Sequence, residues 1–398
     1  MSNLEETSES ASQSSESLQV VPGKIEDERL NSFLAKVIEG SIPPEMCPSL
    51  LELYETILLS DIPAKKYSPK PDVGKTETEC IPNQEAYLTK GAVHSLLTRM
   101  LMEENFNYSL YAYALNKRFM DKMFELFRSP DYRERGSVTL ELNIIYQHCE
   151  PLRVPMFSRV KNDLMDYQQM VSFSQDYNTV AAMLNLLSDM LLMEEPLPPG
   201  EPAKLLSSVL LPLHKHPHLT IFQAELVDAI VHCELRENSF GPVIAKYFLI
   251  KWPHTAVEER STFDFFVCVM KKMPFVWIDP IVNLFFRRLT HCLISHCEVV
   301  HETAWNFTET GFGHNMTQQY EDEFLEVVLS KLIKPSIEHW SRKVRCNLGL
   351  MLARIDQDER LKLFTDHGHE YWPNTHKLRH NDFEYPNELP SDFYFNSD

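Results

Sequence analysis

The chain has 398 residues, with 57 acidic and 38 basic side chains and a formal net charge of −19 at pH 7. This negative balance opposes binding to the nucleic-acid backbone or to an anionic membrane surface, so we expect neither nucleic acid nor membrane among its partners. Eleven glycines are few for this length, and Leu, Met and Phe dominate the apolar residues, which favours helix over sheet. We therefore predict an all-α protein.

The sequence also indicates a cellular compartment. No apolar run approaches the roughly 20 residues that span a bilayer, and the first residues, MSNLEETSES, are acidic and polar where a signal peptide is basic and then apolar. The eight cysteines are scattered, which suits reduced thiols better than a disulfide framework. We expect an intracellular protein, in the cytoplasm and also in the nucleus.

The first part of the chain alternates between polar segments and helical patterns. Residues 1–27 are rich in Ser and Glu and poor in apolar groups, which predicts a mobile acidic tail, with phosphorylation of its serines as an alternative role. Helical spacing starts at Phe33, Leu34 and Val37 and returns at residues 51–58. The polar, Pro-containing stretch 63–84 predicts a long loop.

From residue 85 onward, apolar side chains recur at spacings of three and four, the pattern that lines one face of a helix. These stripes occupy residues 97–101, 110–115, 119–127, 138–149, 160–164, 183–191, 206–213, 222–230, 243–248, 263–270, 282–293, 324–332 and 348–355. Helix pairs that recur about every 40 residues are typical of HEAT- and armadillo-like solenoids. We predict such an α-solenoid of antiparallel helix pairs over residues 28–365 and an irregular tail over 366–398; two compact helical bundles are the alternative.

The sequence contains few residues in patterns typical of catalytic or metal-binding sites. The sequence contains no GxGxxG, Walker-type, GxSxG, HExxH or EF-hand pattern, and Gly311 and Gly313 form a glycine pair without a third glycine. Cys292 and His296 are four apart and would share a helix face, but a structural zinc needs four converging ligands. His214, His216 and His218 surround a proline turn, and His367 and His369 lie in the tail. We expect a binding protein with no catalytic residue, no cofactor and no metal.

Several segments, in a constant order, resemble the B-prime regulatory subunits of protein phosphatase 2A. They are ELFRSPDYRER (125–135), VLLPLHK (209–215), PVIAKYFLIKWPHT (242–255), LFFRRL (284–289) and HW (339–340). The resemblance covers residues 85–364 and, more faintly, extends back to residue 28. It implies a HEAT-like superhelix that is not itself an enzyme but binds the scaffold and catalytic subunits of the phosphatase and selects substrate peptides for them.

The resemblance also implies a peptide groove. In the family, this groove binds peptides that carry an LxxIxE motif, with His and Arg side chains meeting the acidic end and apolar pockets taking Leu and Ile. The corresponding positions in this sequence are Asn143, Ile144, Tyr146, Arg153, Leu186 and Met190. Tyr146 and Arg153 are retained, and Leu186 and Met190 keep the apolar volume.

The departures from the family fall on the cationic half of this groove. Asn143 and Ile144 replace the His and Arg, and Pro199 and Pro202 replace a Lys and a His of the following loop. Since a desolvated Arg–carboxylate contact contributes about 1.5–3 kcal/mol, we expect weak or no LxxIxE binding. The changes reflect either drift or a groove retuned for less acidic peptides.

A second departure affects the surface that faces the phosphatase. The family's acidic segment after its WPKT stretch is replaced here by STFDFFVCV (261–269). This leaves a second hypothesis, in which the chain is a helical adaptor that keeps the fold but no longer serves the phosphatase.

Overall fold

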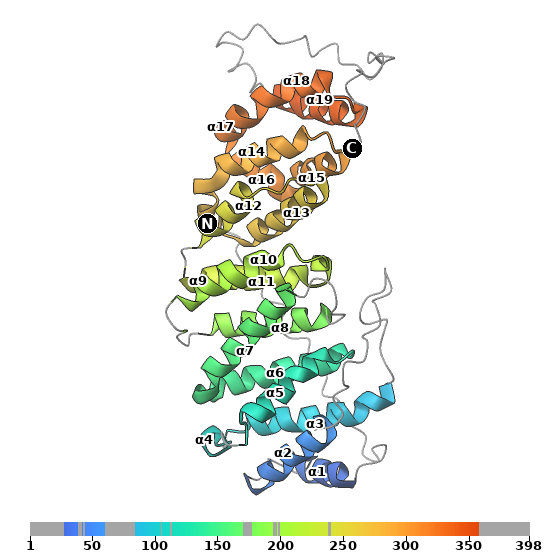
Figure 1. Cartoon of the computed structure of the whole chain (residues 1–398). Helices are drawn as coiled ribbons and strands as arrows, with labels where there is room; N and C mark the ends of the chain where they lie inside the picture. Colours follow the sequence, from blue (N-terminus) through green and yellow to red (C-terminus); the bar gives the residue numbers. More distant parts are fainter. Residues whose placement is uncertain are drawn as a thin grey trace, which may run out of the picture. The chain divides into compact units, whose positions relative to one another are not determined.

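The computed structural model describes residues 28–357 except 39–41, 43, 60–83, 105, 112–113, 170–176, 194–196, 198–199 and 238–239. Within these residues every regular element is a helix (Figure 1). The chain divides into two compact units, Met1–Phe240 and Gly241–Asp398. The predicted all-α fold of packed helix pairs is confirmed. The predicted domain 28–365 spans both units, and the predicted tails 1–27 and 366–398 lie outside the described residues.

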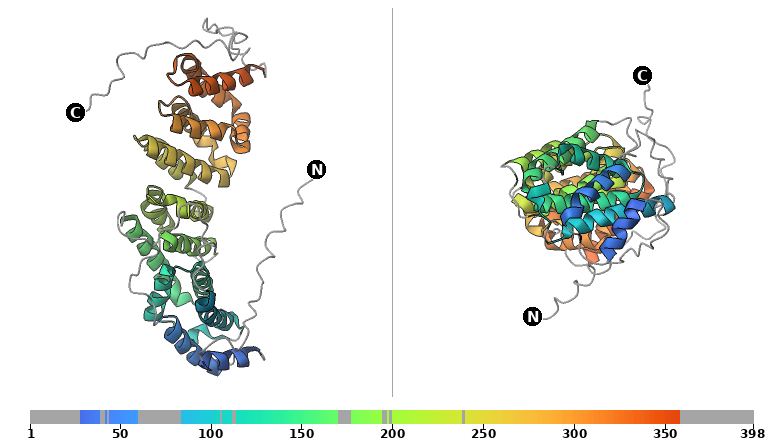
Figure 2. Two further views of the ribbon diagram at one scale, coloured as in Figure 1. Left: turned by 90° about the vertical axis from the view of Figure 1, so that its right-hand side faces the viewer. Right: turned by 90° about the horizontal axis from the view of Figure 1, so that it is seen from below.

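The first unit is a succession of helices, each packed on the next. Its elements are α1 (Glu28–Ile38), η1 (Pro44–Met46), α2 (Cys47–Ile57), α3 (Gln84–Met102), α4 (Tyr108–Tyr111), α5 (Lys117–Glu125), η3 (Leu126–Arg128), α6 (Tyr132–His148), α7 (Glu150–Gln169), α8 (Tyr177–Leu192), α9 (Glu201–Leu205), η4 (Leu206–Leu210), α10 (Leu211–Leu213) and α11 (Leu219–Glu237). Helix α3 packs on α2 and α6, and α8 packs on α6 and α11 (Figure 2). This order of neighbours is that of a helical repeat stack.

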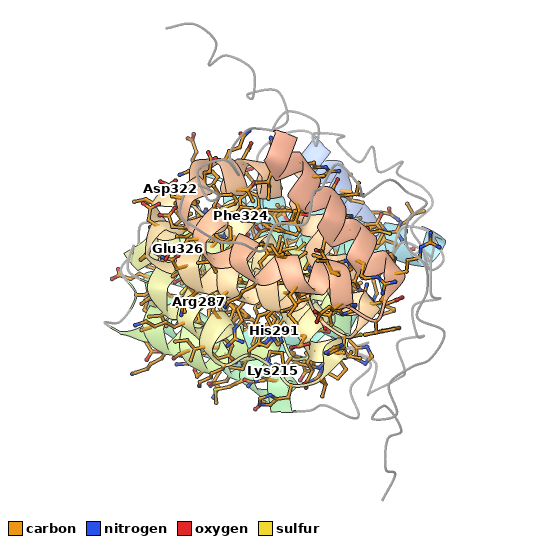
Figure 3. All side chains as sticks on the ribbon, turned by 90° about the horizontal axis from the view of Figure 1, so that it is seen from above. Lys215, Arg287, His291, Asp322, Phe324 and Glu326 are labelled. Carbon is orange, nitrogen blue, oxygen red and sulfur yellow. The ribbon has the colours of Figure 1, made fainter. Side chains whose placement is uncertain are left out.

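The second unit is also a succession of helices that pack on one another. Its elements are α12 (Gly241–Ile250), α13 (Ala256–Lys272), η5 (Phe275–Trp277), η6 (Asp279–Ile281), α14 (Val282–Leu293), α15 (Glu298–Thr308), α16 (Gly311–Gln319), α17 (Glu321–Phe324), η7 (Leu325–Leu329), α18 (Ser330–Glu338) and α19 (Arg342–Gln357). Helix α15 packs against α13 and α14, and α18 packs against α19. Asp322 and Glu326 are exposed at one edge of this unit, whereas Phe324 between them is buried (Figure 3).

The apolar stripes form the cores of both units. Leu206, Val209, Leu210 and Leu213 are each at most 1% exposed. A feature that the stripes do not predict is the π-helical turn at Leu206–Leu210, where the N–H of Leu211 donates to the carbonyl of Leu206 five residues earlier. Pro212 follows directly and has no N–H to donate, so the wide turn precedes the residue that cannot continue an α-helical ladder.

The stripe predicted over residues 110–115 is wrong as a single helix. Helix α4 ends at Tyr111, and Leu110 is 57% exposed. The side chain of Asn116 accepts a hydrogen bond from the N–H of Phe119 and begins α5 at Lys117. This N-cap starts α5 two residues before Phe119, where the apolar stripe over residues 119–127 begins.

A buried polar network connects three helices of the first unit. The hydroxyl of Tyr54 in α2 donates to Glu141 Oε2 in α6 at 2.8 Å, and His94 Nδ1 in α3 lies 3.0 Å from Glu141 Oε1. All three residues are at most 1% exposed. Since a buried carboxylate without partners is costly, these bonds fix the register of the three helices.

Among the helices that the structure describes, none combines the length and apolarity needed to cross a bilayer.

Candidate functional site

A pocket of about 260 Å³ lies in the first unit, where α6 ends, α7 begins and the chain enters α9. We call it the α7 pocket. Its lining combines apolar and charged side chains: Tyr146, Arg153, Val154, Phe157, Ser158, Lys161, Leu197 and Glu201. A concave surface with apolar walls and a few polar groups is suited to hold an apolar side chain of a peptide.

Helix α6, which carries Tyr146, is held at its start. The carboxylate of Asp131 accepts from the Arg133 N–H at 3.0 Å and from the Arg133 guanidinium at 3.0 and 2.7 Å. Burial raises the pKa of Asp131, but the hydrogen bonds from Arg133 outweigh it and lower the pKa overall. The guanidinium also lies 4.0 Å from the ring centroid of Tyr87 in α3. The first turn of α6 is thereby fixed against its neighbour.

The end of α6 is capped by a residue of the next helix. Arg153 donates from Nε to the carbonyl of Tyr146 at 2.9 Å and from Nη2 to the carbonyl of Gln147 at 2.6 Å. These carbonyls belong to the last turn of α6, where a cation is favoured. Arg153 therefore positions Tyr146 and lines the pocket at the same time.

One of the two cations of the pocket, Lys161, is neutralised by a carboxylate of the same pocket. Lys161 Nζ lies 2.5 Å from Glu201 Oε2, and Lys204 Nζ lies 3.1 Å from Glu201 Oε1. The hydrogen bonds from Lys161 and Lys204 lower the pKa of Glu201. The positive charge of Lys161 is thus balanced by the carboxylate of Glu201, so this side chain adds no net charge to the pocket wall.

The structure brings two of the predicted groove residues together in the α7 pocket, Tyr146 and Arg153. Asn143 lies one turn earlier on α6, half-buried, and donates from Nδ2 to Asp189 Oδ2 on α8. Ile144 is 7% exposed, and Leu186 and Met190 have no exposed surface. Ile144, Leu186 and Met190 are core residues that do not line the pocket, and their contact with a peptide remains a prediction.

Sequence reasoning missed Val154, Phe157, Ser158, Lys161, Leu197, Glu201 and, beside the pocket, Asp189. A signal for some of them was present, because Arg153, Phe157 and Lys161 are spaced by four and lie on one face of α7. Leu197 and Glu201 gave no such signal, since they lie in a Pro-rich segment with Gly200 at φ 75°. Of the two prolines predicted to border the groove, Pro199 lies outside the described residues, and Pro202 is buried and accepts from Cys233 Sγ.

The histidine and cysteine clusters serve the fold. The interpretation that Cys292 and His296 share a helix face is wrong, because α14 ends at Leu293; Cys292 is buried, while His296 is exposed and stacks on His339 with ring centroids 5.4 Å apart. His214 is buried, with Nδ1 2.5 Å from the carbonyl of Leu211. Among the described residues, no three His, Cys, Asp or Glu side chains group as a metal would need. His367 and His369 lie outside these residues.

The segment that departs from the family's acidic pattern, residues 261–269, lies inside α13. Phe263, Phe265 and Phe266 are at most 2% exposed, and Phe266 packs near Phe248 and Phe285 with centroids 5.4 and 6.2 Å apart. Helix α13 starts at a capping box, in which Thr255 accepts from the Glu258 N–H and donates to its carboxylate at 2.8 Å. The apolar residues of this segment therefore build the core of the second unit.

Taken together, the successive packed helices of the two units define an all-α helical-repeat protein. The model of the protein phosphatase 2A regulatory B subunit (B56 family) matches residues 17–379. The chain belongs to this family, and the family resemblance seen in the sequence is confirmed.

Individual relatives agree with the family model. The chain is 24% identical over 338 residues to the serine/threonine-protein phosphatase 2A 56 kDa regulatory subunit delta 1 isoform of Schizosaccharomyces pombe, covering 84% of this chain and 59% of the relative. It is 25% identical over 257 residues to the phosphatase 2A regulatory subunit pptr-1 of Caenorhabditis elegans, covering 63% and 46%. It is 24% identical over 254 residues to the human phosphatase 2A 56 kDa regulatory subunit alpha isoform, covering 63% of this chain and 51% of the relative. The chain thus spans about half the length of these relatives, which are named as regulatory subunits.

Proposed function

We propose that this chain is a non-catalytic regulatory subunit of protein phosphatase 2A that binds the scaffold and catalytic subunits and selects substrates for them. The observation that carries the proposal is the family match over residues 17–379, which extends through both units. The helical stack supports it, because such folds present extended surfaces for protein partners. We further propose that the substrate-selecting surface includes the α7 pocket, and the shared lining by Tyr146 and Arg153 supports this.

The LxxIxE motif is expected to bind weakly or not at all. Asn143 and Ile144 supply no positive charge, Lys161 is paired with Glu201, and Arg153 already donates to the carbonyls of Tyr146 and Gln147. An acidic peptide end would therefore lose hydration and meet a single cation, Arg153, whose hydrogen bonds are partly committed to the end of α6. Titration of the purified full chain with an LxxIxE peptide checks this expectation, and an affinity in the micromolar range would contradict it.

The assembly is tested by affinity purification of the full tagged chain from cells. The proposal predicts that the scaffold and catalytic subunits of the phosphatase co-purify and that serine/threonine phosphatase activity is recovered with them. An unrelated tagged helical-repeat protein serves as the control for adventitious capture. Recovery of the chain without either phosphatase subunit would contradict the proposal.

A second candidate function is a helical adaptor that has left the phosphatase. It is favoured by the apolar replacement within α13, since Phe263, Phe265 and Phe266 occupy a stretch that is acidic in the family. The same purification separates the two functions: a stable complex that contains other proteins and neither phosphatase subunit supports the adaptor.

A further inference from the structure

Asn143, one turn before the pocket residue Tyr146 on α6, and Asp189 on α8 form a pair that carries one negative charge. Asn143 on α6 donates its amide to Asp189 on α8, and both side chains are half-buried. This bond sets the orientation of the amide, because the opposite flip would place Asn143 Oδ1 against the carboxylate. In this orientation, Asn143 Oδ1 is buried without a hydrogen-bond partner among the described atoms. The pair thus combines one anionic group with one unsatisfied acceptor.

Among the described residues, no lysine or arginine forms an ion pair with Asp189. The charge of His232 on α11 acts to lower the pKa of Asp189. Arg236 of α11 instead donates to the carbonyls of Leu191 and Met193, and Arg153 donates to the end of α6. Burial raises the pKa of Asp189, and the hydrogen bond from Asn143 opposes this rise. A partly desolvated carboxylate of this kind gains from an added cation.

The pair lies within reach of a peptide held in the pocket. Asn143 and Tyr146 are three residues apart on α6, so their Cβ atoms are about 5–6 Å apart on one face. An extended peptide advances about 3.3 Å per residue. A residue two or three positions from a side chain anchored at Tyr146 therefore reaches the Asn143–Asp189 pair.

We propose that the Asn143–Asp189 pair makes this groove select peptides in which an apolar anchor is accompanied by a lysine or arginine, and reject peptides with a carboxylate at that position. The inference rests on the proposed function in one respect, namely that the α7 pocket receives substrate peptides. A cationic ligand group donates to the half-buried carboxylate of Asp189, whereas a ligand carboxylate meets a like charge there. Asp189 acts as the specificity-determining residue.

The test uses three fluorescent peptides, Leu-Ser-Pro-Ile-Gln-X, with Glu, Gln or Lys as X. Fluorescence polarisation with the full chain is expected to give affinities in the order Lys, Gln, Glu, with about tenfold or more between the first and the last. Asp189→Asn should reduce this ratio to about threefold or less, mainly by weakening the Lys peptide. Asp264→Asn, which removes an exposed carboxylate from α13 in the other unit, is the control for the loss of one negative charge and should leave the ratio unchanged. Phe157→Ala should weaken all three peptides by a similar factor, because it removes a wall of the pocket.

A tighter Glu peptide, equal affinities, no binding of any peptide, or an unchanged ratio in Asp189→Asn overturns the inference. Co-purification of the phosphatase subunits with wild type and with Asp189→Asn is measured alongside. If the subunits co-purify while the peptides behave otherwise than expected, the specificity inference fails and the proposed function stands. If the subunits are absent, the proposed function fails independently of the peptide order.

Discussion

Glu141 is the single side chain on which the register of α2, α3 and α6 most depends. It accepts from Tyr54 and lies within hydrogen-bond distance of His94, and all three are buried. Glu141→Ala should lower the free energy of unfolding by about 3 kcal/mol, because it leaves two buried polar groups without their partner. Tyr54→Phe removes one hydrogen bond and should cost about 1 kcal/mol. Urea denaturation of the full chain measures both, and a larger loss in Tyr54→Phe would contradict the network.

His214 gives the first unit a defined sensitivity to acid. Burial lowers its pKa to about 4, against about 6.5 in an unfolded chain. As the pH falls below about 6.5, the unfolded state takes up a proton that the folded state excludes, so stability is complete above that pH and is lost on acidification toward 4. His214→Gln keeps a donor for the carbonyl of Leu211 and should reduce the loss between pH 7 and 5 by about 2 kcal/mol.

The measurement is urea denaturation at both pH values. His314→Gln, at an exposed position of α16, is the control and should keep the wild-type dependence. An equal acid-induced loss in His214→Gln and wild type would contradict the assignment.

Single residues show where sequence reasoning stops. Tyr146 and Arg153 could be named because they match a family pattern, and the structure places both on one pocket. Glu141 and Asp189 could not be named, because their partners are 40 or more residues away in sequence and only the fold joins them. The same holds for the pairing of Glu201 with Lys161. Charged residues in an acidic chain carry no local signal that separates a solvated carboxylate from a buried one.

At the scale of the helices, α16 contains the glycine pair Gly311 and Gly313, which matches no ligand-binding motif. Helix packing explains one of the two glycines. A Cβ at Gly313 would overlap the main-chain carbonyl of Phe307, whereas a Cβ at Gly311 would meet nothing within 4 Å. The N–H of Gly313 also donates to the capping side chain of Thr310 at 3.0 Å. The close approach of α16 to the end of α15 thus requires a glycine at only one of the two positions.

This asymmetry predicts opposite effects of one substitution. Gly313→Ala should destabilise the second unit by about 3 kcal/mol, because the backbone must move to admit the methyl group. Gly311→Ala should stabilise it by about 0.5 kcal/mol, since the unfolded chain loses freedom at a compatible helical position. Thermal unfolding of both variants measures these changes in stability. Similar changes at the two positions would contradict the proposed packing.

The helices were predictable to the extent that their apolar stripes were regular. The stripe at residues 206–213 is buried as expected, since period and burial coincide there. The π-turn at Leu206–Leu210 and the end of α4 at Tyr111 were missed, because apolar spacing carries no signal for a widened turn before a proline or for the last residue of a short helix. Spacing indicates which face is buried, and capping chemistry determines where a helix ends.

For the chain as a whole, composition and apolar spacing predicted the all-α class, and the described helices confirmed it. The excess of acidic side chains disfavoured nucleic acid, and the few glycines favoured helix. Neither property indicates a partner, because many folds of repeated helices share them. The partner assignment rests on the match over residues 17–379, and the specificity assignment rests on the contacts around Asn143 and Asp189.

The most direct measurement is reconstitution from purified components. The full chain is mixed with the isolated scaffold–catalytic heterodimer of protein phosphatase 2A and analysed by size-exclusion chromatography with light scattering. One copy should join each heterodimer and raise its mass by the 46.4 kDa of this chain. Separate elution of the chain and the heterodimer at micromolar concentrations would contradict its assignment as a regulatory subunit.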